Sequence, residues 1–133
     1  MKKTIRIFLL VMILSSMILP LPATAKSNKA VYYSSSLKTK EHWGEKRTLR
    51  KIVFKKKKII TYGSFDLTKS NGRTVYRRNK KRVFKINKKT KYYLVDVSGY
   101  YRCSQKVLRG YLLNMGLIIK VRNGRAVALM ITP

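Results

Sequence analysis

Residues 117–131 read LIIKVRNGRAVALMI, which is two apolar runs joined by Asn123 and Gly124. Both turn residues tolerate the positive φ angles of a type I′ turn, so this stretch predicts a β-hairpin. A two-residue turn also fixes the strand register. The expected cross-strand pairs are Val121 with Ala126, Ile119 with Ala128, and Leu117 with Met130. One face of the hairpin is then wholly apolar, which predicts that it packs against a core.

Short β-rich runs separated by turns precede this hairpin. Residues 59–67 alternate between two faces, and Gly63 in their middle predicts a bend or a bulge. Asn71 and Gly72 form a second hairpin signal. Residues 49–54 and 91–97 are further candidate strands. Residues 74–77 and 82–86 predict either a hairpin or one long strand with a bulge.

The period of the apolar residues changes after Gly99. Ser104 can cap a helix, and Gly116 stands where a left-handed terminating residue is wanted. Between them, apolar residues recur at spacings of three and four. These residues are Val107, Leu108, Tyr111, Leu112 and Met115. The order of elements is similar to that of OB-like domains. It predicts a mainly β fold: a small antiparallel barrel of about five to six strands, with one short helix before the C-terminal hairpin.

The first 25 residues have the three parts of a Sec-type signal peptide. A basic start leads into an apolar stretch over residues 7–19, and Ala23-Thr24-Ala25 follows. The apolar stretch is shorter than the roughly 20 residues that cross a bilayer. We therefore expect cleavage after Ala25 and a secreted protein, with envelope association as a further expectation. Residues 26–47 are polar and predict a flexible N-terminal arm, and residues 48–133 predict one basic, barrel-like domain.

The charge of the chain is strongly one-sided, with 32 Lys and Arg against 4 Asp and Glu. Removal of the leader takes away Lys2, Lys3 and Arg6 and leaves a net charge near +25. Such a protein attracts polyanions and repels its own copies, so we expect a monomer. Cys103 is the only cysteine, which excludes an intramolecular disulfide. Its thiol is expected to be buried, with a link between chains as the alternative.

The residues available for catalysis are few. Glu41, His42 and Glu45 lie in the predicted arm, whereas a catalytic group must be held in place. Asp66 and Asp96 could bind a divalent ion together only with a third ligand, and none is evident. We expect these two carboxylates to pair with lysines or to cap turns. The sequence therefore predicts no enzyme, no cofactor and no metal site.

Basic residues cluster along the chain and alternate with tyrosines, a mixture that binds polyanions and single-stranded nucleic acid. The candidate anion contacts are Lys55, Lys56, Lys57, Lys58, Arg77, Arg78, Lys80, Lys81, Arg82, Lys88, Lys89 and Lys91. The candidate stacking residues are Tyr92, Tyr100 and Tyr101, although tyrosine is also a favoured core residue of strands.

These features predict an exported, non-enzymatic domain that binds anionic polymers of the cell envelope, or another polyanion, largely through electrostatics. One alternative is a secreted cationic effector that acts on nucleic acid or on membranes. Nucleic acid and peripheral membrane contact are accordingly further candidate partners. A small secreted hydrolase is the other alternative.

Overall fold

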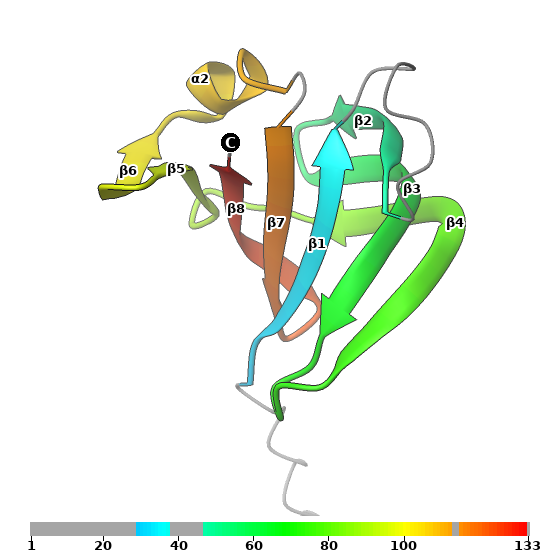
Figure 1. Cartoon of the computed structure of the whole chain (residues 1–133). Helices are drawn as coiled ribbons and strands as arrows, with labels where there is room; N and C mark the ends of the chain where they lie inside the picture. Colours follow the sequence, from blue (N-terminus) through cyan, green and yellow to red (C-terminus); the bar gives the residue numbers. More distant parts are fainter. Residues whose placement is uncertain (1–28, 38–46, 113–114, 133) are drawn as a thin grey trace, which may run out of the picture.

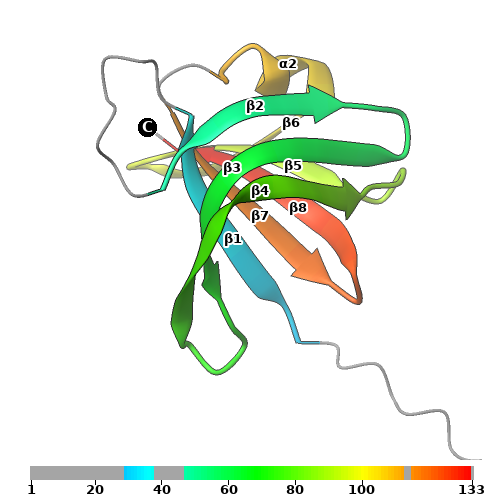
Figure 2. The same cartoon turned by 90° about the vertical axis from the view of Figure 1, so that its right-hand side faces the viewer.

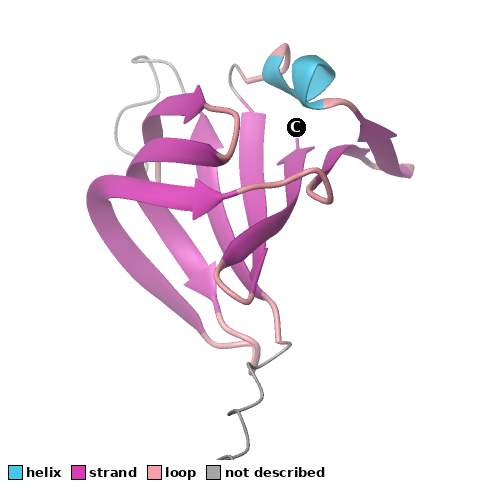
Figure 3. Cartoon of the chain, turned by 180° about the vertical axis from the view of Figure 1, so that it is seen from behind, coloured by secondary structure: helices cyan, strands magenta, loops and turns pink. Residues whose placement is uncertain are grey.

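The computed structural model describes residues 29–37, 47–112 and 115–132. In chain order its elements are β1 (Val31–Leu37), β2 (Leu49–Phe54), β3 (Lys58–Thr68), β4 (Thr74–Lys85), β5 (Lys91–Asp96), β6 (Gly99–Cys103), α2 (Gln105–Arg109), β7 (Met115–Arg122) and β8 (Arg125–Thr132) (Figure 1). The fold is mainly β with one short helix, as predicted (Figure 3). Its eight strands exceed the expected five to six, since residues 31–37 and 99–103 also form strands.

The strands form one sheet in the order β2-β3-β1-β7-β8-β5-β6, and β4 pairs with both β3 and β8. The pairings therefore close a ring through β3, β1, β7, β8 and β4. The last junction consists of a single parallel pair, Lys85 with Arg125. The strands of this ring are not spaced evenly about an axis (Figure 2), so we describe the fold as an eight-stranded sheet.

The hydrophobic core lies on one face of the sheet, at its centre. Ile59, Phe65 and Leu117 are fully buried there. The ring of Tyr33 meets Phe65 and Phe84 edge to face, with centroid distances of 5.6 and 5.1 Å. Such arrangements suit the charge distribution of aromatic rings. The alternation predicted for residues 59–67 thus places the side chains of Ile59 and Phe65 on the core face.

Strand β1 overturns part of the prediction for the N-terminal arm. Residues 31–37 were expected to be flexible, but β1 pairs along its length with β7 and also with β3. The polar side chain of Ser35 can be buried in this strand, because its hydroxyl donates a hydrogen bond to the Ser64 carbonyl over 2.7 Å. The predicted signal peptide, and Glu41, His42 and Glu45, lie outside the described residues.

Gly63 lies between two bulges in the middle of β3. One extra residue in β2 and one in β4 shift the registers on its two sides. Its φ is +153°, and a Cβ atom would lie 2.3 Å from the Thr48 carbonyl oxygen and 2.7 Å from Leu49 Cα. The irregularity predicted at Gly63, a bend or a bulge, is therefore present, but the extra residues lie in β2 and β4 and not in β3. Of the two alternatives for residues 74–86, one long strand with a bulge is correct.

The C-terminal hairpin has the predicted turn, with φ of 52° at Asn123 and 73° at Gly124. Val121 pairs with Ala126 as expected, but Val127 is an extra residue that shifts the rest of the register. The observed pairs are Lys120 with Ala128, Ile119 with Leu129, and Leu117 with Ile131. The two other expected pairs are wrong, because this bulge buries the larger Leu129 and Ile131 and turns Ala128 and Met130 to the opposite face.

Helix α2 begins as predicted, since the Ser104 hydroxyl accepts a hydrogen bond from the backbone N–H of Val107. It ends at Arg109 with Gly110 as its cap, and not at Met115. Met115 and Gly116 begin β7, where a Cβ atom at position 116 would collide with Thr132 Oγ1. Leu112 and Met115 thus pack against the core from the segment after the helix and from β7. Their helical spacing in the sequence could not be distinguished from that of a longer helix.

Candidate anion-binding surfaces

The first candidate surface, here called the tyrosine–lysine face, is a hollow of about 540 Å³ over β1, β7, β8 and β5. Cross-strand partners point to the same side of a sheet. The pairings place one row of side chains across four strands: Tyr32, Lys120, Ala128 and Lys91. Tyr32 directly precedes Tyr33, whose side chain packs against the core. Because successive residues of a strand point to opposite faces, this row lies on the face opposite the core.

The shape of this hollow follows from the bulge at Val127. The extra residue turns the small Ala128 outward, between Lys91 on one neighbouring strand and Lys120 on the other. Strand spacing puts the Cα atoms of the two lysines about 10 Å apart. A small floor between two long cationic side chains makes an open trough that runs along β8.

The tyrosine–lysine face combines positive charge with aromatic rings. Its cations are Lys89, Lys91, Lys120 and Arg122, and its tyrosines are Tyr32, Tyr93 and Tyr100. The Tyr100 side chain is 69% exposed and meets Tyr93 edge to face at 6.4 Å. Lys120 Nζ lies 5.8 Å from the ring centroid of Tyr32. No carboxylate from the described part of the chain lines the hollow.

The second candidate surface, here called the arginine hollow, has a volume of about 430 Å³. It is lined by Tyr33, Tyr76, Arg77, Arg78, Lys80 and Arg82. Arg77, Lys80 and Arg82 pair with the β3 residues Phe65, Gly63 and Thr61. These cations consequently share a face with the hydrophobic core and border its aromatic residues.

Arg82 holds the bulge of β4 in shape. Its guanidinium donates to the carbonyl oxygens of Gly63 at 2.8 Å and Arg78 at 2.7 Å, and more weakly to that of Lys80 at 3.4 Å. The same group lies 5.5 Å from the ring centroid of Phe65. Burial lowers the pKa of Arg82; Tyr33 opposes this effect and Arg77 adds to it. Arg82 is therefore part of the framework of the hollow.

Replacing Arg82 is expected to destabilise the fold. Arg82→Ala leaves carbonyl groups on β3 and β4 without their charged donor, which costs about 2 kcal/mol of unfolding free energy. Arg82→Lys should recover only part of the loss, since one ammonium cannot reproduce the planar fork. Equilibrium unfolding in urea measures the free energy of unfolding of both variants. The neighbouring exposed Lys81→Ala is the control and should change the value by less than about 0.5 kcal/mol; equal losses would contradict the role given to Arg82.

The structure groups some of the predicted site residues and separates others. Arg77, Arg78, Lys80 and Arg82 meet in the arginine hollow, and Lys89, Lys91 and Tyr100 meet in the tyrosine–lysine face. Lys55, Lys56, Lys57 and Lys58 lie at the exposed turn between β2 and β3, as expected, and Lys81 and Lys88 are also exposed on β4 and in the next turn. These six residues line neither hollow.

Two of the tyrosines proposed for stacking have other contacts. Tyr92 packs against the core, and its hydroxyl accepts a hydrogen bond from Gln105 Nε2 over 2.9 Å. Tyr101 lies on the other face of β6 from Tyr100, and its hydroxyl bonds with that of Ser98. The tyrosine of β5 that lies beside Tyr100 is Tyr93. The alternation of β5 could have indicated this, had the inward face been known.

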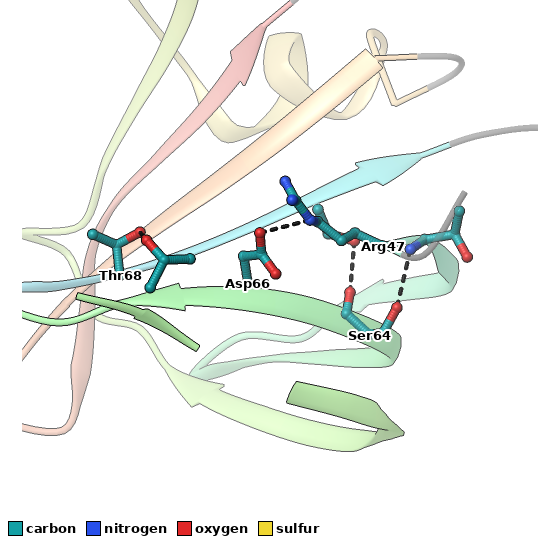
Figure 4. A network of polar contacts seen from close by, with 7 residues as sticks. Arg47, Ser64, Asp66 and Thr68 are labelled. Atoms are coloured by element: carbon teal, nitrogen blue, oxygen red, sulfur yellow. Dashed lines mark hydrogen bonds and ion pairs between the residues drawn. The ribbon is translucent and has the colours of Figure 1, made fainter. Parts of the chain in front are cut away.

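The two described aspartates were expected to pair with lysines or to cap turns, and the structure shows one ion pair and one turn. Asp66 is 7% exposed, and its Oδ2 lies 2.6 Å from Nε of Arg47 (Figure 4). Its partner is thus an arginine and not a lysine. Asp96 Oδ1 accepts hydrogen bonds from Ser98 and from the Gly99 backbone. Within residues 29–37, 47–112 and 115–132, no three His, Cys, Asp or Glu side chains are grouped to hold a metal ion.

The thiol of Cys103 packs against the core. Cys103 is partly buried and not disulfide-bonded, and burial raises the pKa of its thiol. A raised pKa lowers the fraction of thiolate, which is the reactive form. This agrees with the expected behaviour of a small apolar side chain.

The turn at Asp96 gives a pH prediction. Hydrogen bonds from the hydroxyl and the backbone N–H of Ser98 lower the pKa of Asp96 below 3.8. A lowered pKa means that the turn is favoured above pH 3.8 and loses this contribution as the pH falls through the folded value. Ser98→Ala should raise the pKa, as measured by NMR titration of the Asp96 carboxyl carbon. Identical midpoints in the two proteins would contradict this account.

Comparison of the chain with protein-family models, curated proteins and solved structures finds no match. Among the helical residues that the structure describes, none belongs to a helix of the length and apolar character that a membrane crossing requires.

Proposed function

We propose that this chain is an exported, non-enzymatic domain that binds anionic polymers of the cell envelope through its basic surfaces. The proposal includes secretion through the predicted signal peptide, with cleavage after Ala25. The observation that carries it is the tyrosine–lysine face: four cations around one trough, with no carboxylate among its described lining residues. An unbalanced cluster of this kind concentrates polyanions at the surface.

The geometry of the trough supports a linear ligand. Lys91 and Lys120 stand on either side of Ala128 in one row across the sheet, so a chain that lies along β8 contacts both of them. The exposed ring of Tyr100 offers an apolar face beside them. The cations provide attraction to spaced negative groups, and the rings provide contact area between those groups.

We also propose that the ring of pairings corresponds to an OB-like barrel. The order of pairing supports it: β3 joins β1 and β4, β7 joins β1 and β8, and β4 meets β8 in parallel. The helix falls between β4 and β7, after the third strand of this ring. Barrels of this type bind oligonucleotides and oligosaccharides on a strand face and its adjoining loops, which agrees with a linear ligand.

The test uses the protein collected from the medium of cells that express the full chain. Mass spectrometry should show a form that begins at Lys26. Its binding to purified wall polymer, single-stranded DNA and anionic vesicles is then measured side by side. If about six anionic groups are neutralised, affinity should fall on the order of a thousandfold between 50 and 200 mM salt. Binding to none of the three at low salt would overturn the proposal.

A further inference from the structure

The arginine hollow places cations where a β-sheet normally places apolar side chains. Arg77, Lys80 and Arg82 occupy core-face positions of β4, opposite Phe65, Gly63 and Thr61. The same face carries the buried Phe84 two residues further along the strand. Arg77 and Lys80 are exposed, and Arg82 is partly buried. Like charges gathered at one place repel one another, and an anion bound between them would relieve this repulsion.

The bulge of β4 brings the cations together. Ser64 faces two residues of β4, Arg78 and Asn79, so the strict alternation of side chains is broken at this point. Arg77, Arg78 and Lys80 consequently line one hollow, although regular alternation would put neighbouring residues on opposite faces. The carbonyl groups of Arg78 and Lys80 are held by Arg82. The arrangement is therefore set by the fold before any ligand binds.

Two guanidinium groups in this hollow have donors to spare. Neither Arg77 nor Arg78 forms a side-chain hydrogen bond or ion pair with the residues that the structure describes. A guanidinium presents its N–H groups as a planar fork that matches two oxygens of a phosphate or of a carboxylate. A planar carboxylate has only these two oxygens and engages one fork, whereas the oxygens of a tetrahedral phosphate point in several directions and can engage two forks at once. Lys80 adds a point charge at the same hollow. Two forks and one ammonium on a braced strand make a site for a tetrahedral oxyanion.

We propose that the arginine hollow is a phosphate-binding site and that it gives the protein a preference for phosphate-bearing polymers over carboxylate-bearing ones. This inference rests on the proposed function and specifies the chemistry of its ligand. Arg77 and Arg78 contact the phosphate oxygens and Lys80 contributes charge. Arg82 is a positioning residue, because its donors are occupied by backbone carbonyls.

The experiment compares polyphosphate with poly-glutamate at equal charge concentration, using the secreted protein and calorimetry at low salt. We expect about tenfold tighter binding to polyphosphate. Arg77→Lys/Arg78→Lys keeps the charge but removes both forks, so it should bring the ratio of affinities close to one and weaken poly-glutamate binding less than polyphosphate binding. The matched control is Arg73→Lys/Arg102→Lys, two exposed arginines outside the hollow, which should keep the preference.

The source of the phosphate is tested with two further ligands, a polyol-phosphate wall polymer and oligothymidylate, at equal phosphate concentration. Tighter binding to either ligand that is lost in the double variant supports the phosphate site and identifies the source of the phosphate, whereas binding of both ligands that is unchanged in the double variant overturns it. Equal binding of polyphosphate and poly-glutamate by the unchanged protein also overturns the inference but leaves the proposed function standing. If the protein binds neither polymer, both the inference and the proposed function are overturned.

Discussion

Gly63→Ala is expected to lower the free energy of unfolding by about 4 kcal/mol or more. The added Cβ would meet the backbone of β2 at 2.3 Å from the Thr48 oxygen and 2.7 Å from Leu49 Cα, and neither atom belongs to a flexible side chain. The φ of +153° adds strain that only glycine avoids. Relief would require β2 to move away from β3. Urea unfolding followed by circular dichroism measures the loss.

Gly72→Ala is the matched control for this substitution. Gly72 also has a positive φ, +85°, but a Cβ atom there has no neighbour within 4 Å among the described residues. Strain alone should cost about 1 kcal/mol. A similar loss in both variants would show that backbone conformation, and not the close approach of β2, makes glycine necessary at position 63.

Lys91→Glu/Lys120→Glu is expected to weaken binding to anionic polymers by about a hundredfold or more at 50 mM salt. The two side chains flank Ala128 in the trough, so the change replaces two attractive contacts with two repulsive ones. Each exposed contact contributes about 1 kcal/mol in water, and 1.4 kcal/mol corresponds to a factor of ten. The slope of affinity against salt concentration should also become shallower.

The control for this pair is Lys56→Glu/Lys57→Glu, which makes the same change in net charge at the exposed turn before β3. These lysines line neither hollow. Only a severalfold loss is expected, from the lower total charge. Equal losses in the two double variants would mean that overall charge governs binding and that the tyrosine–lysine face has no special part in it.

The turns and the general class of the fold could be predicted from the sequence, because Asn123 and Gly124 have few alternatives to a type I′ turn. The bulge at Val127 could not. A bulge changes which side chains face inward without leaving a local mark, and its position is decided by how well Leu129 and Ile131 fill the core. Strand β1 was missed for a related reason, since its serines find partners only after β3 is in place.

The clusters of basic residues could be predicted from the sequence, but the way in which the strands group them in space could not. Clusters such as Arg77 and Arg78 are visible in the sequence, and the structure brings them together with Lys80. The members of the tyrosine–lysine face come from strands distant in sequence, and Tyr32 and Lys120 meet only through the pairing of β1 with β7. The choice of Tyr93 over Tyr92 depended on which side of β5 is inward.

The single pair between Lys85 and Arg125 has a consequence for how the molecule can open. The other junctions of the ring are ladders of several residues, whereas this one joins two like charges, which disfavours pairing at that point. Parting there would separate β4 from β8 and leave every other ladder in the ring intact. Local opening of the fold should therefore begin at the junction of β4 with β8.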